Sequence, residues 1–363
     1  MNRIVLIILF YFLTLSAAIV LPNGISDYNA YILCCLCILY ILLIKSSAVY
    51  RSSLLCGLAL CLTSILNFQP YTLVDCALIF SIFGSIYIGL HFPIKKKELR
   101  FFKYCFFFIY LISLLGIFNP SLYRDTGDGF RYSGLFHAVN FSASIFSILG
   151  IAIWEIEKTE RKTVWILLIL IMSLLIYIWA TSTRSLLFTL PYWLYQLYTR
   201  CNKTVLVTSI LLICILYLPS IIEAVSVKLR LEENESSIAT RSVLYLQLLS
   251  GIRDNYGIIP HGSHAATQMI VDFTGDPLFS PHNDILTYIY DWGAVFYIFC
   301  IMIGINLKKY ISFNIEFCLI LLVIIACALH NMMLSLYIWI PFIIILTTRR
   351  NINDPYTNFK AIS

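Results

Sequence analysis

Charged residues are scarce in this 363-residue sequence: Asp, Glu, Lys and Arg make up 12% of it, whereas soluble globular domains contain about 25%. Hydrophobic residues make up 60%, against roughly 45–50% in such domains, and the mean hydropathy is +0.86. This composition excludes a soluble enzyme, a secreted domain and a DNA-binding protein. It predicts a protein that is embedded in a lipid bilayer.

Long polar stretches are also missing, with one exception, and apolar runs dominate the chain. One helical crossing takes about 20 apolar residues and a short connector, so a chain of this length allows on the order of twelve crossings. The apolar runs lie near residues 4–21, 30–44, 53–68, 71–92, 104–118, 135–154, 164–180, 185–199, 204–220, 284–306, 311–329 and 334–348. We therefore expect an all-α polytopic membrane protein with about 12 transmembrane helices. Its expected parts are a membrane domain over 1–220, an external loop over 221–283, and a second membrane domain with a tail over 284–363.

Basic residues are distributed unequally between the two sides of this predicted topology. If the N-terminus is cytoplasmic, eighteen of the 25 Lys and Arg residues lie in the even-numbered connectors and the two termini. The seven on the opposite side are Arg124, Arg131, Arg184, Lys228, Arg230, Arg241 and Arg253. Cytoplasmic loops carry an excess of Lys and Arg, so the asymmetry predicts that both termini are cytoplasmic. The first run resembles a secretory signal, and we expect it to be retained as a span.

The loop over 221–283 is the one long connector, and it contains none of the 12 cysteines. Most cysteines lie in or beside apolar runs, which is typical of small hydrophobic side chains rather than of metal ligands or disulfides. Apolar or neutral side chains recur at helical spacing after Thr240, at Val243, Leu244, Gln247, Leu248 and Ile252. We expect an amphipathic helix that Thr240 caps, that lies on the membrane surface and that loosens at Gly251.

Six of the seven external basic residues are arginines, although translocated loops are usually poor in positive charge. Arginine binds phosphate with two parallel hydrogen bonds and keeps its charge, which suits a lipid-linked phosphate or pyrophosphate. Arg184 follows Thr181, Ser182 and Thr183 at a turn where a helix is expected to begin, and unpaired amides there favour an anion. For Lys228 and Arg230, contact with lipid headgroups remains the alternative.

The segment from Ser280 to Asp284 precedes the tenth apolar run and has the pattern of a helix start. Ser280 is expected to cap it, Pro281 suits the first helical position, and His282 and Asn283 then fall in the first turn. A neutral histidine there can accept a proton from a hydroxyl group, and a protonated one can bind an anion. An ordinary solvated side chain is the alternative for His282.

Other titratable residues are weaker candidates. His261 and His264 lie near Asp272 and Asp276 and could form a metal site, although unliganded histidines are the favoured interpretation. Asp75 and Glu316 lie within apolar runs, where ionisable residues are usually functional, but both can lie near a membrane face.

Several of these segments together resemble the family of O-antigen ligases and polymerases. Arg131, Tyr132, Ser133, Gly134, Leu135, Phe136 and then Asn140 match an R-x-x-G-x-F-x-x-x-N pattern. The T-x-T-R turn that ends at Arg184, the T-R-S-V-L-Y stretch that contains Arg241, and P-H-N-D-I-L followed by Gly293 resemble the other motifs. The resemblance covers roughly 120–300 and places the long loop, as in the family, between the ninth and tenth spans. Asp291 and Trp292 depart from it, since a glutamate and smaller residues are frequent there, and His282 follows a proline rather than a second histidine.

The resemblance implies a fold like that of the C-type glycosyltransferases and an active site that faces the periplasm, in the bacterial inner membrane. The implied reaction transfers a glycan from undecaprenyl pyrophosphate to an acceptor, which is the next lipid-linked repeat unit for a polymerase and lipid A-core for a ligase. His282, Arg184 and Arg241 are the implied catalytic residues. We expect Arg131, Asn140, Asn283 and Arg253 to contact the substrate or shape its site. The departures favour a polymerase.

The implied partners are the undecaprenyl-pyrophosphate-linked oligosaccharide, membrane lipids and a chain-length regulator; no cofactor, metal or nucleic acid is expected. A flippase for the same lipid-linked oligosaccharide is the rival from another class, and it predicts charges along a central path and two related halves. The sequence instead gathers its external charges at one face and shows no repeat. A structural scaffold would leave the external arginines unexplained.

Overall fold

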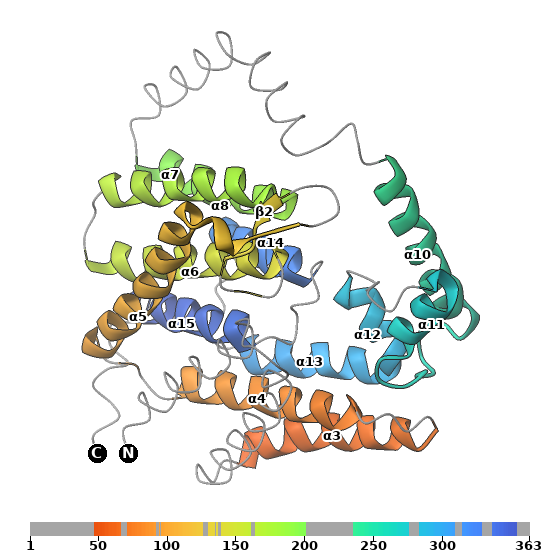
Figure 1. Ribbon diagram of the computed structural model, residues 1–363. Helices are drawn as coiled ribbons and strands as arrows, with labels where there is room; N and C mark the ends of the chain where they lie inside the picture. Colours follow the sequence, from red (N-terminus) through yellow and green to blue (C-terminus); the bar gives the residue numbers. More distant parts are fainter. Residues whose placement is uncertain are drawn as a thin grey trace. The chain divides into compact units, whose positions relative to one another are not determined.

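The computed structural model describes residues 47–66, 71–91, 94, 96–125, 130–134, 136, 139–160, 164–200, 235–275, 283–308, 314–328 and 336–353. These residues form helices and one short hairpin, and they divide into two compact units (Figure 1). The predicted spans at 4–21, 30–44 and 204–220 lie outside the described residues, as do Ser280, Pro281 and His282. The other nine apolar runs each coincide with helical structure.

The first unit contains two helices from before residue 95, the elements between 239 and 311, and the C-terminal helix. These are α3 (Ser47–Leu66), α4 (Tyr71–His91), α10 (Glu235–Asp254), α11 (Ala265–Thr274), α12 (Asp284–Trp292), α13 (Ala294–Lys308) and α15 (Leu336–Asn353). The second unit contains the elements between 96 and 238 and one later helix. These are α5 (Lys96–Leu115), η1 (Gly116–Phe118), η2 (Pro120–Leu122), β1 (Tyr123–Asp125), β2 (Phe130–Tyr132), α6 (Val139–Glu160), α7 (Val164–Thr181), η3 (Arg184–Thr189), α8 (Leu190–Arg200) and α14 (Ile315–Ala328).

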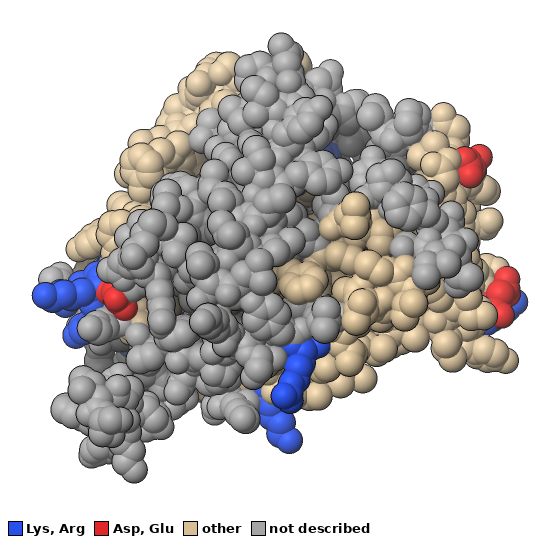
Figure 2. Space-filling model, turned by 90° about the horizontal axis from the view of Figure 1, so that it is seen from below, with Lys and Arg blue, Asp and Glu red and all other residues tan. Residues whose placement is uncertain are grey.

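Several of these helices have the composition of membrane spans. The helical stretches Lys96–Phe118, Val139–Lys158 and Val164–Thr181 are each long and apolar enough to cross a bilayer, and α12 with α13 would make a fourth if the pair is one bent span. Few charged side chains interrupt the described surface that Figure 2 shows. The described part of the chain is therefore mostly helical and has the character of a membrane protein, with three to four candidate spans.

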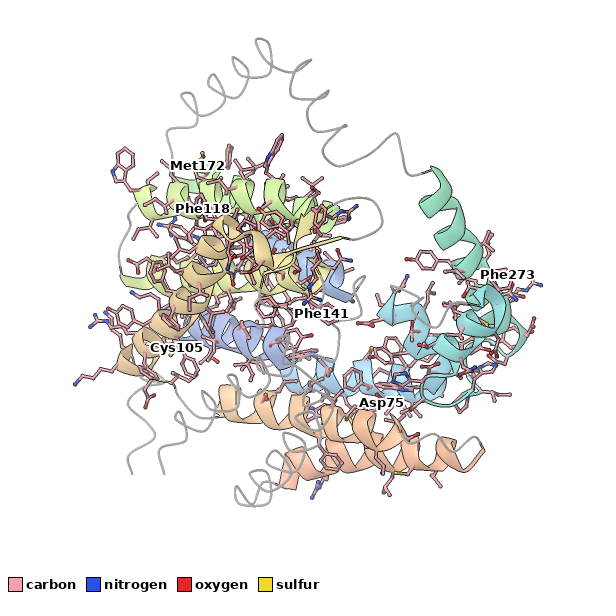
Figure 3. The ribbon with its side chains drawn as sticks, viewed as in Figure 1. Asp75, Cys105, Phe118, Phe141, Met172 and Phe273 are labelled. Atoms are coloured by element: carbon pink, nitrogen blue, oxygen red, sulfur yellow. The ribbon has the colours of Figure 1, made fainter. Side chains whose placement is uncertain are left out.

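The second unit is built around α6. Of the candidate span Val139–Lys158, 89% is buried, compared with 39% of α7 and 28% of the span that begins with α5. α7 buries Leu170 and Leu174 but exposes Met172 and Trp179, so it is apolar on every side. Met172 lies on the outer side of α7 in Figure 3. A helix that is apolar all round and exposed on one side suits a lipid-facing position.

One end of the second unit carries an ionic network. Lys158 Nζ lies 2.7 Å from Glu155 Oε1 and 2.6 Å from Glu316 Oε1, so it connects α6 with α14. Tyr192 in α8 donates a hydrogen bond to Glu155 at 2.6 Å, and Lys103 in α5 pairs with Glu157 at 2.8 Å. Glu316, which the sequence places inside a span, is thus paired at a helix end.

The opposite end of the second unit carries the short hairpin and the turn that leads to Arg184. The hydroxyl of Tyr132 in β2 donates to the carbonyl of Ser113 near the end of α5 at 2.5 Å. Its ring meets that of Tyr177, near the end of α7, edge to face at 5.5 Å. The ends of α5 and α7, the start of α6 and the hairpin therefore lie together, as alternating spans require.

The first unit shows the same alternation. α3 and α4 pack as an antiparallel pair, and α13 runs along them. At one end Asn306 donates to Ser52 at 3.3 Å, and at the other end Trp292 donates to Asp75 at 3.2 Å. α13 alone, without α12, therefore extends from the level of the start of α3 to the level of the start of α4.

The expected tenth span at 284–306 is not one straight helix. α12 and α13 meet at Gly293 with a bend of 120°. Gly293 has φ +53°, and a Cβ atom there would overlap the carbonyl group of Ile258. The close approach of this loop and the left-handed backbone both require glycine, so the chain turns where hydropathy predicts continuity.

Candidate functional site

The T-R-S-V-L-Y stretch forms a helix, as expected, but the helix begins earlier. α10 starts at Glu235, so Thr240 lies inside it and the prediction of Thr240 as its cap is wrong. No glycine or proline interrupts residues 235–239, which lets the helix extend toward the N-terminus. The helix also continues past Gly251 to Asp254, so the expected loosening at Gly251 is not seen. The ring of Tyr290 packs against this turn so closely that a Cβ at Gly251 would overlap it.

A small apolar cluster attaches α10 to its neighbours. Its buried members are Leu244, Leu248, Ala266 and Ile270, and its half-buried members are Met269, Leu286 and Tyr290. The cluster joins α10, α11 and α12. Leu244 follows Arg241 by one turn, and Leu286 follows Asn283 by one turn, so the T-R-S-V-L-Y and P-H-N-D-I-L motifs belong to one packed group of helices.

The start of α12 differs from the expected one. Asn283 is its cap: its backbone is extended, with φ −155°, and its side-chain oxygen accepts the amide of Leu286 at 3.2 Å. The prediction of Ser280 as the cap is therefore wrong, because the helix begins three residues later. The side-chain oxygen of Asn283 holds the helix, while His282 itself lies outside the described residues.

The loop before α11 is fixed to the bend between α12 and α13. The carboxylate of Asp291 accepts the amides of His264 at 2.9 Å and Ala266 at 2.7 Å. It therefore caps α11, whose own N-cap residue, His264, forms no side-chain cap. The amides of His261 and Gly262 donate to the carbonyls at the end of α12, at 3.2 and 2.9 Å.

The metal-site alternative at the two histidines gains no support. The ring of His261 stacks on Tyr290 with centroids 4.0 Å apart, and Asp272 accepts a hydrogen bond from Gln268 at 2.8 Å. Within the described ranges, no three His, Cys, Asp or Glu side chains are arranged to hold a metal ion. Asp276 lies outside those ranges.

The R-Y-S-G-L-F segment is mainly built into the fold of the second unit. Tyr132 and Ser133 have 0% exposure, and Phe136 has 1%. Gly134 has φ +63°, and a Cβ there would meet the hydroxyl of Ser142 at 3.0 Å. Burial raises the pKa of the Tyr132 hydroxyl, so this group stays protonated and donates to Ser113.

Arg131 and Asn140 lie near this buried segment, and both are half-buried. Arg131 stands directly opposite Arg124 in the antiparallel pair of β1 and β2. Two basic side chains therefore occupy facing positions in this hairpin. Asn140 lies in the first turn of α6, two residues before Ser142, whose hydroxyl hydrogen-bonds that of Tyr177.

The T-S-T-R turn closes the end of α7. Thr181 is buried and donates its hydroxyl to the carbonyl of Tyr177 at 2.8 Å, and Ser182 has φ +52°. Arg184 then begins η3, whose N-cap Thr183 makes no side-chain cap. The expected helix start is therefore present, but it opens as a 3₁₀-helix, and Pro191 has no amide to continue the α-helical pattern backward.

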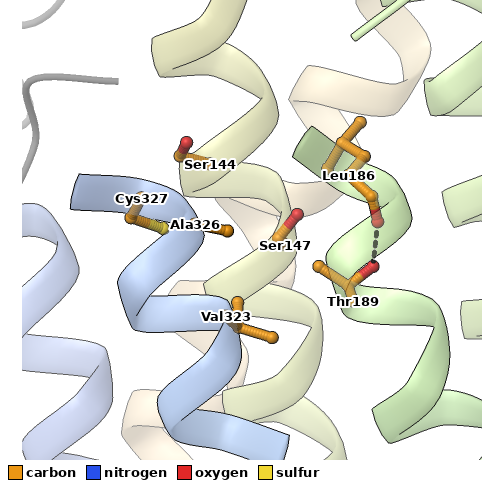
Figure 4. Close-up of a pocket in the computed structure, with 7 residues that line it drawn as sticks. All are labelled: Ser144, Ser147, Leu186, Thr189, Val323, Ala326 and Cys327. Carbon is orange, nitrogen blue, oxygen red and sulfur yellow. Dashed lines mark hydrogen bonds between the residues drawn. The ribbon is translucent and has the colours of Figure 1, made fainter. Parts of the chain in front are cut away.

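A cavity of about 10 Å³ lies below this turn in the second unit (Figure 4). Its lining residues are Ser144 and Ser147 of α6, Leu186 and Thr189 of η3, and Val323, Ala326 and Cys327 of α14. The hydroxyls of Ser147 and Thr189 already donate to the carbonyls of Ala143 and Leu186. The volume admits about one water molecule and no sugar.

The predicted site residues thus fall into two groups. In the second unit, Arg131 and Asn140 lie at the same end as the turn before Arg184. In the first unit, Arg241 and the exposed Arg253 lie on α10, which packs against the helix that Asn283 caps. The structure describes only the backbone of Arg184 and Arg241. Ser263 and Tyr288, which adjoin Asp75 in the first unit, were missed from the sequence because only tertiary contacts distinguish them.

No protein-family model matches this sequence, and neither a curated protein nor a solved structure is significantly similar to it. The described residues define a mostly helical protein with the apolar helices of a membrane protein.

Proposed function

We propose that the protein is an O-antigen polymerase that transfers the growing glycan from undecaprenyl pyrophosphate to the next lipid-linked repeat unit. One observation carries this proposal. The apolar cluster of α10, α11 and α12 packs the helix of Arg241 against the helix that begins directly after His282 and Asn283. The T-R-S-V-L-Y and P-H-N-D-I-L motifs would then contribute to one site. This is required if Arg241 binds the anion and His282 acts as the base on the same substrate.

The proposed reaction is a single displacement at the anomeric carbon. His282 accepts the proton of the acceptor hydroxyl while that oxygen bonds to the anomeric carbon, and the bond to the pyrophosphate oxygen breaks. The pyrophosphate leaves with the bonding electron pair. Arg184 and Arg241 stabilise the negative charge that develops on it, and neither arginine titrates near neutral pH. One in-line displacement inverts the anomeric configuration.

The remaining predicted residues have supporting roles in this proposal. Arg131 and Asn140 lie beside the segment that anchors the hairpin, and Arg253 lies on the exposed last turn of α10. We assign them contacts with phosphate or sugar groups. We place the site at the periplasmic face of the bacterial inner membrane, with both termini in the cytoplasm and twelve spans in the whole chain. An O-antigen ligase that transfers the glycan to lipid A-core is the alternative within the same chemistry.

A flippase for the same lipid-linked oligosaccharide is the second candidate, and the 120° bend at Gly293 is the observation that favours it. Discontinuous helices are typical of transporters, in which their broken ends line the substrate site. Here, however, loop amides satisfy the carbonyls at the end of α12. The polymerase therefore remains the function that we favour.

To test this proposal, a strain from which the gene is deleted is complemented with the original gene or with a single variant. The lipopolysaccharide of each strain is then compared on a gel. Arg184→Ala, Arg241→Ala and His282→Ala should each leave core with one repeat unit, because repeat units still reach the periplasm but are not joined. Arg51→Ala is the matched control, since it removes an exposed arginine of α3 far along the chain from every motif. Core without any repeat unit in the deletion strain would identify a ligase or a flippase. Normal banding in all three variants would refute the catalytic assignment.

A further inference from the structure

Asp75 is a buried carboxylate in the first unit, only 5% exposed. It lies beyond the first turn of α4, at the bend between α12 and α13 (Figure 3). Trp292, which is fully buried, donates its indole N–H to Asp75 Oδ2 at 3.2 Å. A neutral donor offsets only part of the cost of burying a negative charge.

Two other buried carboxylates lie near Asp75, and each has compensation that Asp75 lacks. Asp291 accepts two backbone amides at the N-terminus of α11, where the helix dipole favours negative charge. Asp284 is the first residue of α12 and benefits from the same effect. Asp75 lies outside such a first turn, and in the described part of the chain no basic side chain pairs with it. Among the described residues, Tyr288 and Tyr337 are the other titratable groups that face this cluster.

Two buried hydroxyl groups belong to residues that adjoin Asp75 in space or along α4. Ser263 is 2% exposed, and its hydroxyl lies next to the carboxyl group of Asp75. Thr72 is also 2% exposed, and it lies three residues before Asp75, on the same face of α4. Neither hydroxyl meets the geometry of a hydrogen bond with any residue that the structure describes. A buried hydroxyl that meets no hydrogen-bond geometry favours a bound atom beside it, because an unmade hydrogen bond is costly.

We propose that Asp75, Ser263 and Thr72 bind a small monovalent cation. One uncompensated carboxylate matches one positive charge, and carboxylate and hydroxyl oxygens are ligands for hard cations. A divalent ion would need further anionic ligands, and both oxygens of Asp291 already accept amides. The cation would join α4 to the loop before α11 and to the end of α12. This site is independent of the glycan reaction.

Sodium is the probe for this site. The full-length protein, purified in detergent, should bind radioactive Na⁺ saturably with one ion per chain. Its unfolding temperature should be about 5 °C higher in NaCl than in choline chloride of equal ionic strength, as for a ligand well above its Kd. Potassium and lithium chloride show how the site selects by ion size.

Single variants distinguish a bound cation from a proton or a water molecule as the partner of the Asp75 carboxyl group and the two hydroxyls. Asp75→Asn should abolish Na⁺ binding, and Ser263→Ala and Thr72→Val should each weaken it at least tenfold while preserving the fold. Asp272→Asn, which neutralises an exposed carboxylate of α11, should bind Na⁺ like the original chain. If Na⁺ binding is absent, or is the same in Ser263→Ala and Thr72→Val as in the original chain, a proton or a water molecule fills the cluster and the proposal is wrong.

Discussion

The carboxylate of Asp291 accepts the backbone amide of Ala266 at 2.7 Å, so the last turn of α12 caps the first turn of α11. Replacing Asp291 with alanine should leave the amides of α11 without their acceptor. We expect the free energy of unfolding to fall by about 2 kcal/mol, as for the loss of a buried cap. Chemical unfolding in detergent measures the loss.

Limited proteolysis shows which segment the loss of the Asp291 cap destabilises. The loop before α11 should become sensitive to protease in Asp291→Ala and remain resistant in Asp272→Ala, which removes an exposed carboxylate from the same helix. Equal resistance in both variants would mean that the cap does not hold this loop.

Gly293 and Gly304 form a matched pair. Gly293→Ala should destabilise the protein by at least about 2 kcal/mol, because its φ of +53° is strained for alanine and the new Cβ overlaps Ile258. Gly304→Ala places a Cβ where no atom lies within 4 Å and should stabilise α13 by about 0.5 kcal/mol. Thermal unfolding of the two variants tests this. If Gly293→Ala unfolds like the original chain, the bend is not fixed by this residue.

Gly116 and Tyr132 should show strong coupling in a double-mutant cycle. A Cβ at Gly116 overlaps the hydroxyl oxygen of Tyr132 but lies 3.4 Å from the ring carbon that carries it. Gly116→Ala should therefore cost more than about 1 kcal/mol in the original chain and much less in Tyr132→Phe, which removes only that oxygen. Unfolding in denaturant gives the four free energies. Additive effects would contradict the packing of the hairpin against α5.

Lys158 holds two carboxylates at one end of the second unit. Lys158→Met keeps the length of the side chain but leaves Glu155, which is fully buried, without its cation. We expect a loss of about 3 kcal/mol, because removal of one partner strands a buried charge. Lys97→Met, at an exposed position of α5, should change stability by less than about 0.5 kcal/mol. Similar unfolding temperatures for the two variants would show that the network contributes nothing.

Hydropathy predicted the helices of the apolar runs that the structure describes, but it predicted neither α11, which lies in the polar loop, nor the bend at Gly293. Burial in lipid or protein demands long apolar runs, so each run that the structure describes contains helical structure. Gly293 lies within such a run, and its run gives no sign of a break. Only the loop that packs against it, from a segment more than thirty residues earlier, requires the bend.

The candidate site was less predictable from the sequence, because its details depend on tertiary contacts. Ser280 and Asn283 are both good capping residues, so the sequence alone does not decide which of them begins the helix. In the structure the cap is Asn283, and Leu286 in the first turn of the helix packs against α10. Asp291 differs from the residue that is frequent in the resembling family, and its cap on α11 gives it a structural role. The contact between Asp75 and Trp292 spans 217 positions, beyond any local pattern.

The break at Gly293 interrupts a helix among apolar residues, where lipid offers no hydrogen bonds to stray peptide groups. The segment from Ile258 to Gly262 forms hydrogen bonds with these peptide groups. The amide of Ala294 donates to the carbonyl of Ile258 at 2.9 Å, and two amides of the segment donate to carbonyls at the end of α12. Withdrawing this segment would leave peptide groups on both sides without hydrogen-bond partners, so we expect it to stay in place. If the protein is the proposed polymerase, its glycan would have to enter along another side of α12, and a covalent tether between positions 258 and 294 should leave its activity intact.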